Sequence, residues 1–201
     1  MARVIILMLL ACLAILSCSS DASENDNRTN YVEDACSVTH YRALCIRSLS
    51  PFSSVAKGNP SLWARAGVSV TIGEAKRVAQ YLATLKKNKT MMRGRNKIAL
   101  SDCVECFQDT LDNLHQSLYV LRKLSVRKFG SQVDDVATWV SAALTDEDTC
   151  VDGFDEGKGK GKGKRVKSVI NRVSNVTYLT SNALALINKL ATAGPRCLVN
   201  D

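Results

Sequence analysis

Cysteines are the residues whose number and spacing most directly suggest chemistry in this chain, and their fate depends on the compartment in which they fold. Two of the eight, Cys12 and Cys18, lie in an apolar run that follows one positive charge at Arg3 and ends before small residues near Ala22. This pattern predicts a cleaved signal peptide over residues 1–22. The apolar run has about 13 residues, whereas a membrane-spanning helix needs about 20, so secretion without a membrane anchor is expected.

Six cysteines remain after cleavage: Cys36, Cys45, Cys103, Cys106, Cys150 and Cys197. In an oxidising compartment an even number of cysteines first indicates disulfide bonds. Zinc binding or redox chemistry is the alternative, because Cys103 and Cys106 form a Cys-x-x-Cys pair, but no second pair or neighbouring histidine completes a site. We therefore expect disulfides, and neither a metal nor another cofactor.

The side chains that usually perform catalysis do not form a known catalytic pattern. His40 and His115 are the two histidines, and isolated histidines are more often structural or solvated. The sequence has no G-x-S-x-G, H-E-x-x-H or phosphate-loop motif. Four carboxylates that we interpret as solvated surface cluster in one segment: Asp146, Glu147, Asp148 and Asp152. A glycosidase would need two carboxylates facing each other across a cleft, so we do not expect an enzyme.

The elements that must position these residues are helices. In four long segments within residues 59–194, apolar residues recur every three or four positions, which is typical of amphipathic helices packed in a bundle. Asn59 and Pro60 form a start signal for the first helix. Gly130 is predicted to end the second helix, and Ser131 to begin the third in a capping box.

Two segments differ from these four helices in length or composition. Residues 31–58 contain two short helical patterns and are predicted to form a small helical hairpin. Residues 153–165, in which glycine and lysine alternate from Gly157 to Lys164, are predicted to be a flexible, solvated loop that could also contact a polyanion or an acidic partner. Trp139 and Phe154 are expected to pack in the core, whereas Trp63 could either cap the bundle or be exposed.

Four motifs in the mature chain are familiar: CSVTHYRALC, ALSDCVECFQDTLDNL, TWVSAALTDEDTCVDGF and LTSNALALI. With these motifs, the sequence from about Tyr31 to Leu190 resembles the plant invertase and pectin methylesterase inhibitor family. The resemblance implies an all-α fold, an up-down-up-down four-helix bundle with an N-terminal helical hairpin, in one inhibitor domain over residues 23–201.

The resemblance also implies two disulfides, Cys36 with Cys45 and Cys103 with Cys150. Cys106 and Cys197 fall outside these four matched positions. They could pair with each other, stay free or bond another chain. Losing either implied disulfide is expected to loosen the bundle.

The function that the resemblance implies is inhibition of plant pectin methylesterase through a protein complex that covers the active-site cleft, in the apoplast or cell wall. Acid invertase is the alternative target. Invertase inhibitors tend to carry Pro-Lys-Phe at the turn before the third bundle helix, and residues 127–129 read Arg-Lys-Phe here. The further alternative is a basic wall protein that binds pectin through the glycine-lysine loop, residues 153–165, without inhibiting an enzyme.

Residues on the outer faces of the second and third bundle helices are predicted to contact the enzyme: Thr110, Asn113, Gln116 and Ser117. Three sequons predict N-glycosylation: Asn27, Asn88 and Asn175. The net charge of +8 survives cleavage, since the leader loses Arg3 and Asp21 together. Such a charge often indicates nucleic-acid binding, but a secreted protein is not expected to meet nucleic acid, whereas wall pectin is a polyanion.

Overall fold

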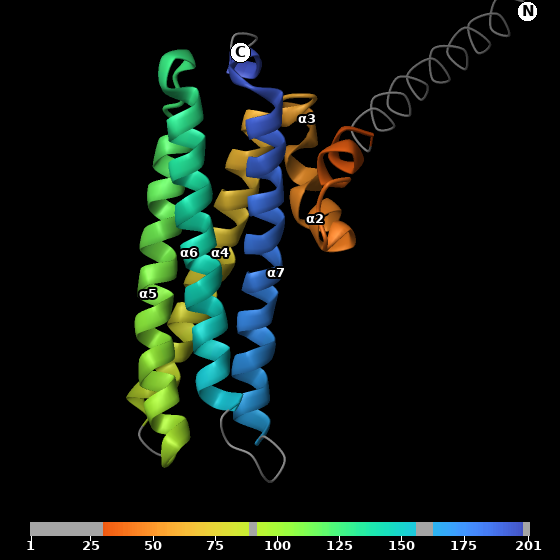
Figure 1. Cartoon of the computed structure of the whole chain (residues 1–201). Helices are drawn as coiled ribbons and strands as arrows, with labels where there is room; N and C mark the ends of the chain where they lie inside the picture. Colours follow the sequence, from red (N-terminus) through yellow and green to blue (C-terminus); the bar gives the residue numbers. More distant parts are fainter. Residues whose placement is uncertain (1–29, 89–91, 156–162, 199–201) are drawn as a thin grey trace, which may run out of the picture.

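Four long antiparallel helices form the body of the protein (Figure 1). The computed structural model describes residues 30–88, 92–155 and 163–198. The long helices are α4 (Pro60–Lys87), α5 (Arg95–Leu121), α6 (Phe129–Asp155) and α7 (Lys164–Ala193). They run up and down in turn, and the described residues contain no strand. The predicted up-down-up-down bundle is confirmed.

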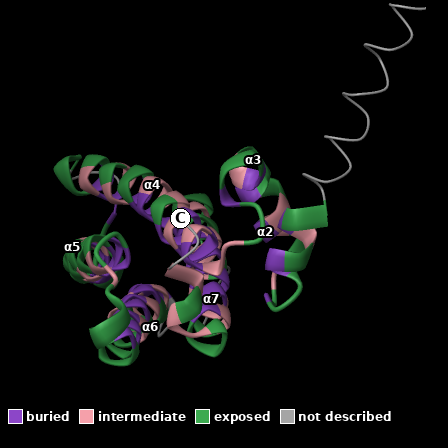
Figure 2. Ribbon diagram, turned by 90° about the horizontal axis from the view of Figure 1, so that it is seen from above, coloured by how far each residue is buried: buried purple, intermediate pink, exposed green. Residues whose placement is uncertain are grey.

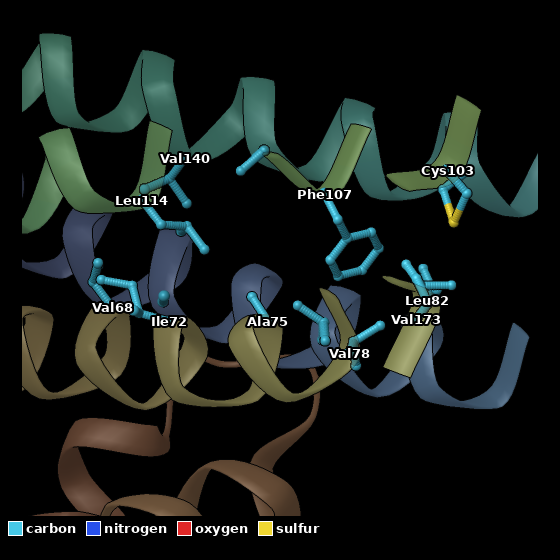
Figure 3. Packing of buried hydrophobic residues seen from close by; sticks show 14 of the residues in the cluster. Val68, Ile72, Ala75, Val78, Leu82, Cys103, Phe107, Leu114, Val140 and Val173 are labelled. Atoms are coloured by element: carbon cyan, nitrogen blue, oxygen red, sulfur yellow. A yellow bond between two sulfur atoms is a disulfide. The ribbon is translucent and has the colours of Figure 1, made fainter. Parts of the chain in front are cut away.

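Each long helix turns one stripe of residues toward the bundle axis, at alternating steps of three and four. In α6, for example, the buried stripe is Phe129, Val133, Val136, Val140, Ala143, Glu147, Cys150 and Phe154. Such spacing keeps one face of a helix toward its neighbours when the helices cross at a small angle. Figure 3 shows aliphatic side chains and Phe107 interlocking across the bundle.

The first bundle helix begins as its local sequence predicts. The Asn59 side-chain oxygen accepts hydrogen bonds from the backbone N–H of Ser61 at 2.8 Å and of Leu62 at 3.3 Å. Pro60 takes the first helical position, where no N–H is required. Gly194 follows α7 with a positive φ of 73° and donates its N–H to the Leu190 carbonyl, as a glycine helix stop does.

The N-terminal segment packs against only part of the bundle. Residues 30–36 are helical and are followed by α2 (Arg42–Leu49), a short 3₁₀ turn at Ser50–Phe52 and α3 (Ser53–Ala56). A second, smaller apolar cluster joins this hairpin to α4 and α7. Trp63 lies within that cluster, and its indole N–H donates to the Lys57 carbonyl at 2.7 Å, so this tryptophan caps the bundle.

Polar contacts fix the position of the hairpin along α7. The Tyr41 N–H donates to the Asn182 side chain at 3.1 Å, and the Asn182 amide donates back to the Tyr41 carbonyl at 3.0 Å. The Tyr41 ring stacks on Tyr178 with 4.1 Å between ring centres. The hairpin therefore covers α4 and α7, while the outer sides of α5 and α6 stay uncovered (Figure 2).

The turn between α5 and α6 differs from its prediction. Helix α5 ends at Leu121, and after a 3₁₀ turn at Val126–Lys128, α6 begins at Phe129. Gly130 thus lies in the first turn of α6 rather than at a helix stop. Ser131 donates its hydroxyl proton to the Lys128 carbonyl and forms no capping box. Burial of Phe129 in the core accounts for the earlier start, since it anchors the first turn.

The boundaries of the glycine-lysine segment are also narrower than predicted. Residues 153–155 belong to α6 and 164–165 to α7, so these parts of 153–165 are helical, and residues 156–162 lie outside the described structure. Phe154 is buried in the core, as expected. A Cβ added to Gly153 would lie 3.5 Å from the Ala99 Cβ, so α5 passes close to α6 here and their packing continues the helix beyond the glycine.

The predicted signal peptide, residues 1–22, and the Asn27 sequon lie outside the described residues. Within the described part of the chain, none of the helices combines the length and apolar character needed to cross a membrane.

Candidate inhibitory surface

A disulfide joins α5 to α6, the two helices on which the enzyme contacts were predicted. Cys103 bonds Cys150, with 4.3 Å between their Cα atoms. A second disulfide, Cys36–Cys45, closes the hairpin across nine residues. These are the two bonds that the family resemblance implies. Both α5 and α6 are therefore held in fixed register near one end of the bundle.

The two remaining cysteines do not pair with each other. The Cys197 thiol donates to the Gly194 carbonyl at 3.0 Å, and Cys106 lies half-buried on α5. Burial raises the pKa of the Cys106 thiol, and the negative charge of Asp146 raises it further. This thiol therefore has little thiolate character at neutral pH.

The structure corrects two of the four predicted contact residues. Thr110 and Ser117 have no exposed surface. They belong to the α5 stripe that faces the bundle axis, one turn or less from Phe107, Leu114 and Leu121. Polar residue type favoured an outward position, but the three-four spacing places both inside. Neither side chain therefore lies on the outer face on which it was predicted.

The other two predicted residues do lie at the surface. Gln116 is exposed, and Asn113 is half-buried where α5 meets α6. The Asn113 side-chain amide donates to Asp146 Oδ2 on α6 at 3.3 Å. Partial burial and the charge of Asp109 raise the pKa of Asp146, while the Asn113 hydrogen bond lowers it. Asn113, Gln116, Asp109 and Asp146 therefore share one surface along the α5–α6 seam.

Glu147 is a second correction, because it was expected on a solvated surface. Its side chain has no exposed area, and it occupies a core position between Ala143 and Cys150 in the α6 stripe. Thr180 on α7 donates to Glu147 Oε1 at 2.7 Å, and Oε2 has no hydrogen-bond partner among the described residues. Burial raises the pKa of Glu147 to about 8. Continuing the three-four spacing beyond Val140 would have located this residue.

Charge is distributed unevenly between the two sides of the bundle. Residues 102–156, which contain most of α5 and all of α6, have twelve Asp and Glu against four Lys and Arg. The rest of the chain has 23 Lys and Arg against seven Asp and Glu. The exposed acidic residues of the α5–α6 side are Asp102, Glu105, Asp109, Asp112, Asp134, Asp135, Asp148 and Asp152. This basic protein therefore presents one acidic, uncovered face, which we call the α5–α6 face.

Among the described residues, no group of three or more His, Cys, Asp or Glu side chains is arranged to hold a metal ion. His40 lies edge-on to the Tyr41 ring, and His115 is exposed on α5.

Two of the predicted glycosylation sites lie within the described residues. Asn88 is exposed at the C-cap of α4, whereas Asn175 is half-buried within α7. A glycan would therefore fit Asn88 more readily.

Comparison with known proteins agrees with the motifs. The family model described as plant invertase/pectin methylesterase inhibitor matches residues 30–186. Pectinesterase inhibitor 6 of Arabidopsis thaliana is 47% identical over 184 residues, covering 90% of this chain and 86% of that protein. The 21 kDa protein of Daucus carota is 37% identical, covering 90% and 92%. The crystal structure of mutant form A of a pectin methylesterase inhibitor from Arabidopsis shares the fold, with a TM-score of 0.60 at 22% identity and coverage of 76% and 92%. The chain therefore belongs to the plant invertase/pectin methylesterase inhibitor family.

Proposed function

We propose that this protein is a secreted inhibitor of plant pectin methylesterase, which lays its α5–α6 face over the active-site cleft of the enzyme. In the apoplast or cell wall, this would limit the de-esterification of pectin. The observation that carries the choice of target is the 47% identity, over nearly the whole chain, to a protein named pectinesterase inhibitor.

Three properties support the α5–α6 face as the contact surface. The hairpin leaves it uncovered (Figure 2). The Cys103–Cys150 disulfide and the close packing at Gly153 hold the two helices together before binding, which lowers the ordering cost of forming a complex. Its exposed acidic side chains would attract basic groups on the enzyme, and attraction of this kind weakens with salt.

Acid invertase is the other target within the family, and one assay separates the two. The purified, oxidised protein is titrated in parallel against a plant pectin methylesterase and an acid invertase. We expect inhibition of the methylesterase alone. Inhibition of invertase alone would overturn the target, and inhibition of neither would overturn the proposed function.

The contact surface is tested with a matched pair of substitutions. Gln116→Lys adds a long cation to the α5–α6 face, and Gln80→Lys adds the same group to the exposed side of α4. Because a misplaced charge in a desolvated interface typically costs several kcal/mol, we expect Gln116→Lys to weaken inhibition at least about tenfold and Gln80→Lys to leave it unchanged. Equal inhibition by both variants would place the contact elsewhere.

A further inference from the structure

A basic strip lies along the start of α7, where this helix meets α4 and the residues that lead into α5. Two adjoining hollows form it. One, of about 630 Å³, is lined by Arg93, Asn96, Lys164 and Arg165. The other, of about 520 Å³, is lined by Lys164, Lys167, Asn171 and Arg172 among others. Lys164 borders both hollows, so together they form one surface.

Two long stretches of the sequence around this strip contain no acidic residue. Residues 75–101 contain eight Lys and Arg and no Asp or Glu, and residues 157–200 contain nine Lys and Arg and no Asp or Glu. The antiparallel fold brings the end of α4 and the start of α7 to the same end of the bundle (Figure 1). Two positively charged segments distant in sequence therefore add their fields at one place.

Among the described residues that line the strip, the single acidic side chain, Glu74, already has a hydrogen-bond partner. Glu74 accepts a hydrogen bond from Arg77 Nε at 2.9 Å within α4. Arg172, by contrast, lies over the Tyr81 ring, with its guanidinium carbon 4.4 Å from the ring centre. The Tyr81 hydroxyl donates to Ser168 on α7 at 3.1 Å, which fixes the ring beneath the guanidinium. These contacts hold Arg172 in place, and among the described residues no carboxylate forms an ion pair with it.

The shape of the strip suits a chain of anions better than one small ion. From Lys164 to Arg172, α7 rises by about 12 Å at about 1.5 Å per residue, so its cations lie in a row and do not converge on a point. Guanidinium groups bind carboxylates through two parallel hydrogen bonds. Amides such as Asn96 and Asn171 can accept from and donate to hydroxyl groups. These are the groups of a linear polysaccharide with regularly spaced carboxylates.

We propose that this strip binds de-esterified pectin through its uronate carboxylates, leaving the α5–α6 face available to the enzyme. The choice of pectin among polyanions rests on the proposed function, because demethylation by the target enzyme creates these carboxylates. The inhibitor is then retained where the product of the enzyme has accumulated.

The test compares two variants with the same loss of charge. Arg93, Lys164, Lys167 and Arg172 are replaced by Gln in the strip variant. In the control variant the four cations of the α5–α6 turn are replaced by Gln: Arg122, Lys123, Arg127 and Lys128. Binding to polygalacturonate and to fully methyl-esterified pectin is measured by affinity electrophoresis at two salt concentrations. Circular dichroism checks that each variant folds.

We expect the parent protein to bind polygalacturonate more tightly at low salt than at high salt and not to bind the methyl-esterified polymer. The strip variant should lose about tenfold or more in affinity, and the control variant less than about threefold. Equal losses in both variants would show a response to net charge alone and overturn the site. Equal binding to the methyl-esterified polymer would overturn the role of the carboxylates.

Inhibition of pectin methylesterase, assayed separately on methyl-esterified substrate, distinguishes this proposal from the proposed function. The strip variant should inhibit as the parent does. If the parent binds polygalacturonate but fails to inhibit, and only the strip variant loses this binding, the strip is upheld and the inhibitory role refuted. Inhibition without polygalacturonate binding would refute the strip alone.

Discussion

The hydroxyl oxygen of Thr180 on α7 lies 2.7 Å from Glu147 Oε1 on α6 and 3.0 Å from the carbonyl oxygen of Val176. A hydroxyl has one proton, so it can donate to only one of these two acceptors at a time. Donation of this proton to Glu147 stabilises the carboxylate and lowers its pKa. Burial has the larger effect and raises the pKa of Glu147 to about 8, so the buried side chain is mainly neutral at pH 5 to 7.

The first prediction is that the free energy of unfolding falls as the pH rises from 5 to 8. The pKa of Glu147 in the folded state, about 8, lies above its ordinary value of 4.5, so the folded protein holds a proton that the unfolded chain has released in this range. The contribution of Glu147 to the free energy of unfolding is constant below pH 4.5 and decreases toward pH 8, by up to about 1.4 kcal/mol per pH unit. Urea unfolding at several pH values measures this decrease.

Two substitutions serve as the test and its control. Glu147→Gln keeps the shape and removes the ionisation, so this variant should lose most of the slope and exceed the parent in stability at pH 8. Asp148→Asn changes the neighbouring, exposed carboxylate and should preserve the slope. A parent whose unfolding free energy does not change between pH 5 and 8 would contradict a neutral, buried Glu147.

The second prediction concerns Thr180, the hydrogen-bond partner of the Glu147 carboxyl group. Thr180→Val keeps the volume of the side chain but leaves Glu147 without its hydroxyl partner, which should cost about 1–3 kcal/mol at pH 5. Thr180→Ser keeps the hydroxyl and should cost less than the valine variant. Thermal unfolding at pH 5 compares the two, and the opposite order of stability would show that packing of the methyl group matters more than the hydrogen bond.

The third prediction uses two glycines of α4. A Cβ at Gly67 would lie 3.0 Å from Leu186 Cδ1 and 3.4 Å from the Ala183 Cα on α7, whereas a Cβ at Gly73 would meet no atom within 4 Å. Gly73→Ala should therefore stabilise the protein by up to about 1 kcal/mol through helix propensity. Gly67→Val should destabilise it by about 1–3 kcal/mol through overpacking. A stabilising Gly67→Val change, seen as a higher melting temperature, would refute the close α4–α7 contact.

The fourth prediction ranks the two disulfides. Cys103–Cys150 closes a segment of 47 residues, and Cys36–Cys45 one of nine. By loop-closure entropy, replacing both members of the longer bond by Ala should cost about 4 kcal/mol, and replacing both members of the shorter about 2–3 kcal/mol. Denaturant unfolding of the two double variants measures the order. A larger loss from the hairpin disulfide would mean that docking of the hairpin contributes more than loop closure.

Helix positions were predictable from the sequence where local signals decide them. Asn59 and Pro60 mark the start of α4 because an amide acceptor and a fixed φ satisfy the first turn without help from the rest of the fold. At Gly153 the local signal was misleading. Glycine and lysine composition predicted a loop, but contact with Ala99 on α5 extends α6 through this position.

The sequence by itself determined four amphipathic helices, a hairpin and the motifs of the family, because periodicity and helix caps act within a few residues. The three-four spacing already points Thr110, Ser117 and Glu147 inward, but only the tertiary structure decided that these polar side chains are fully buried, since burial of a polar group depends on the partners that neighbouring helices supply. It also decided that the acidic α5–α6 face and the basic strip lie apart. That separation follows from antiparallel packing, which places distant segments of like charge side by side.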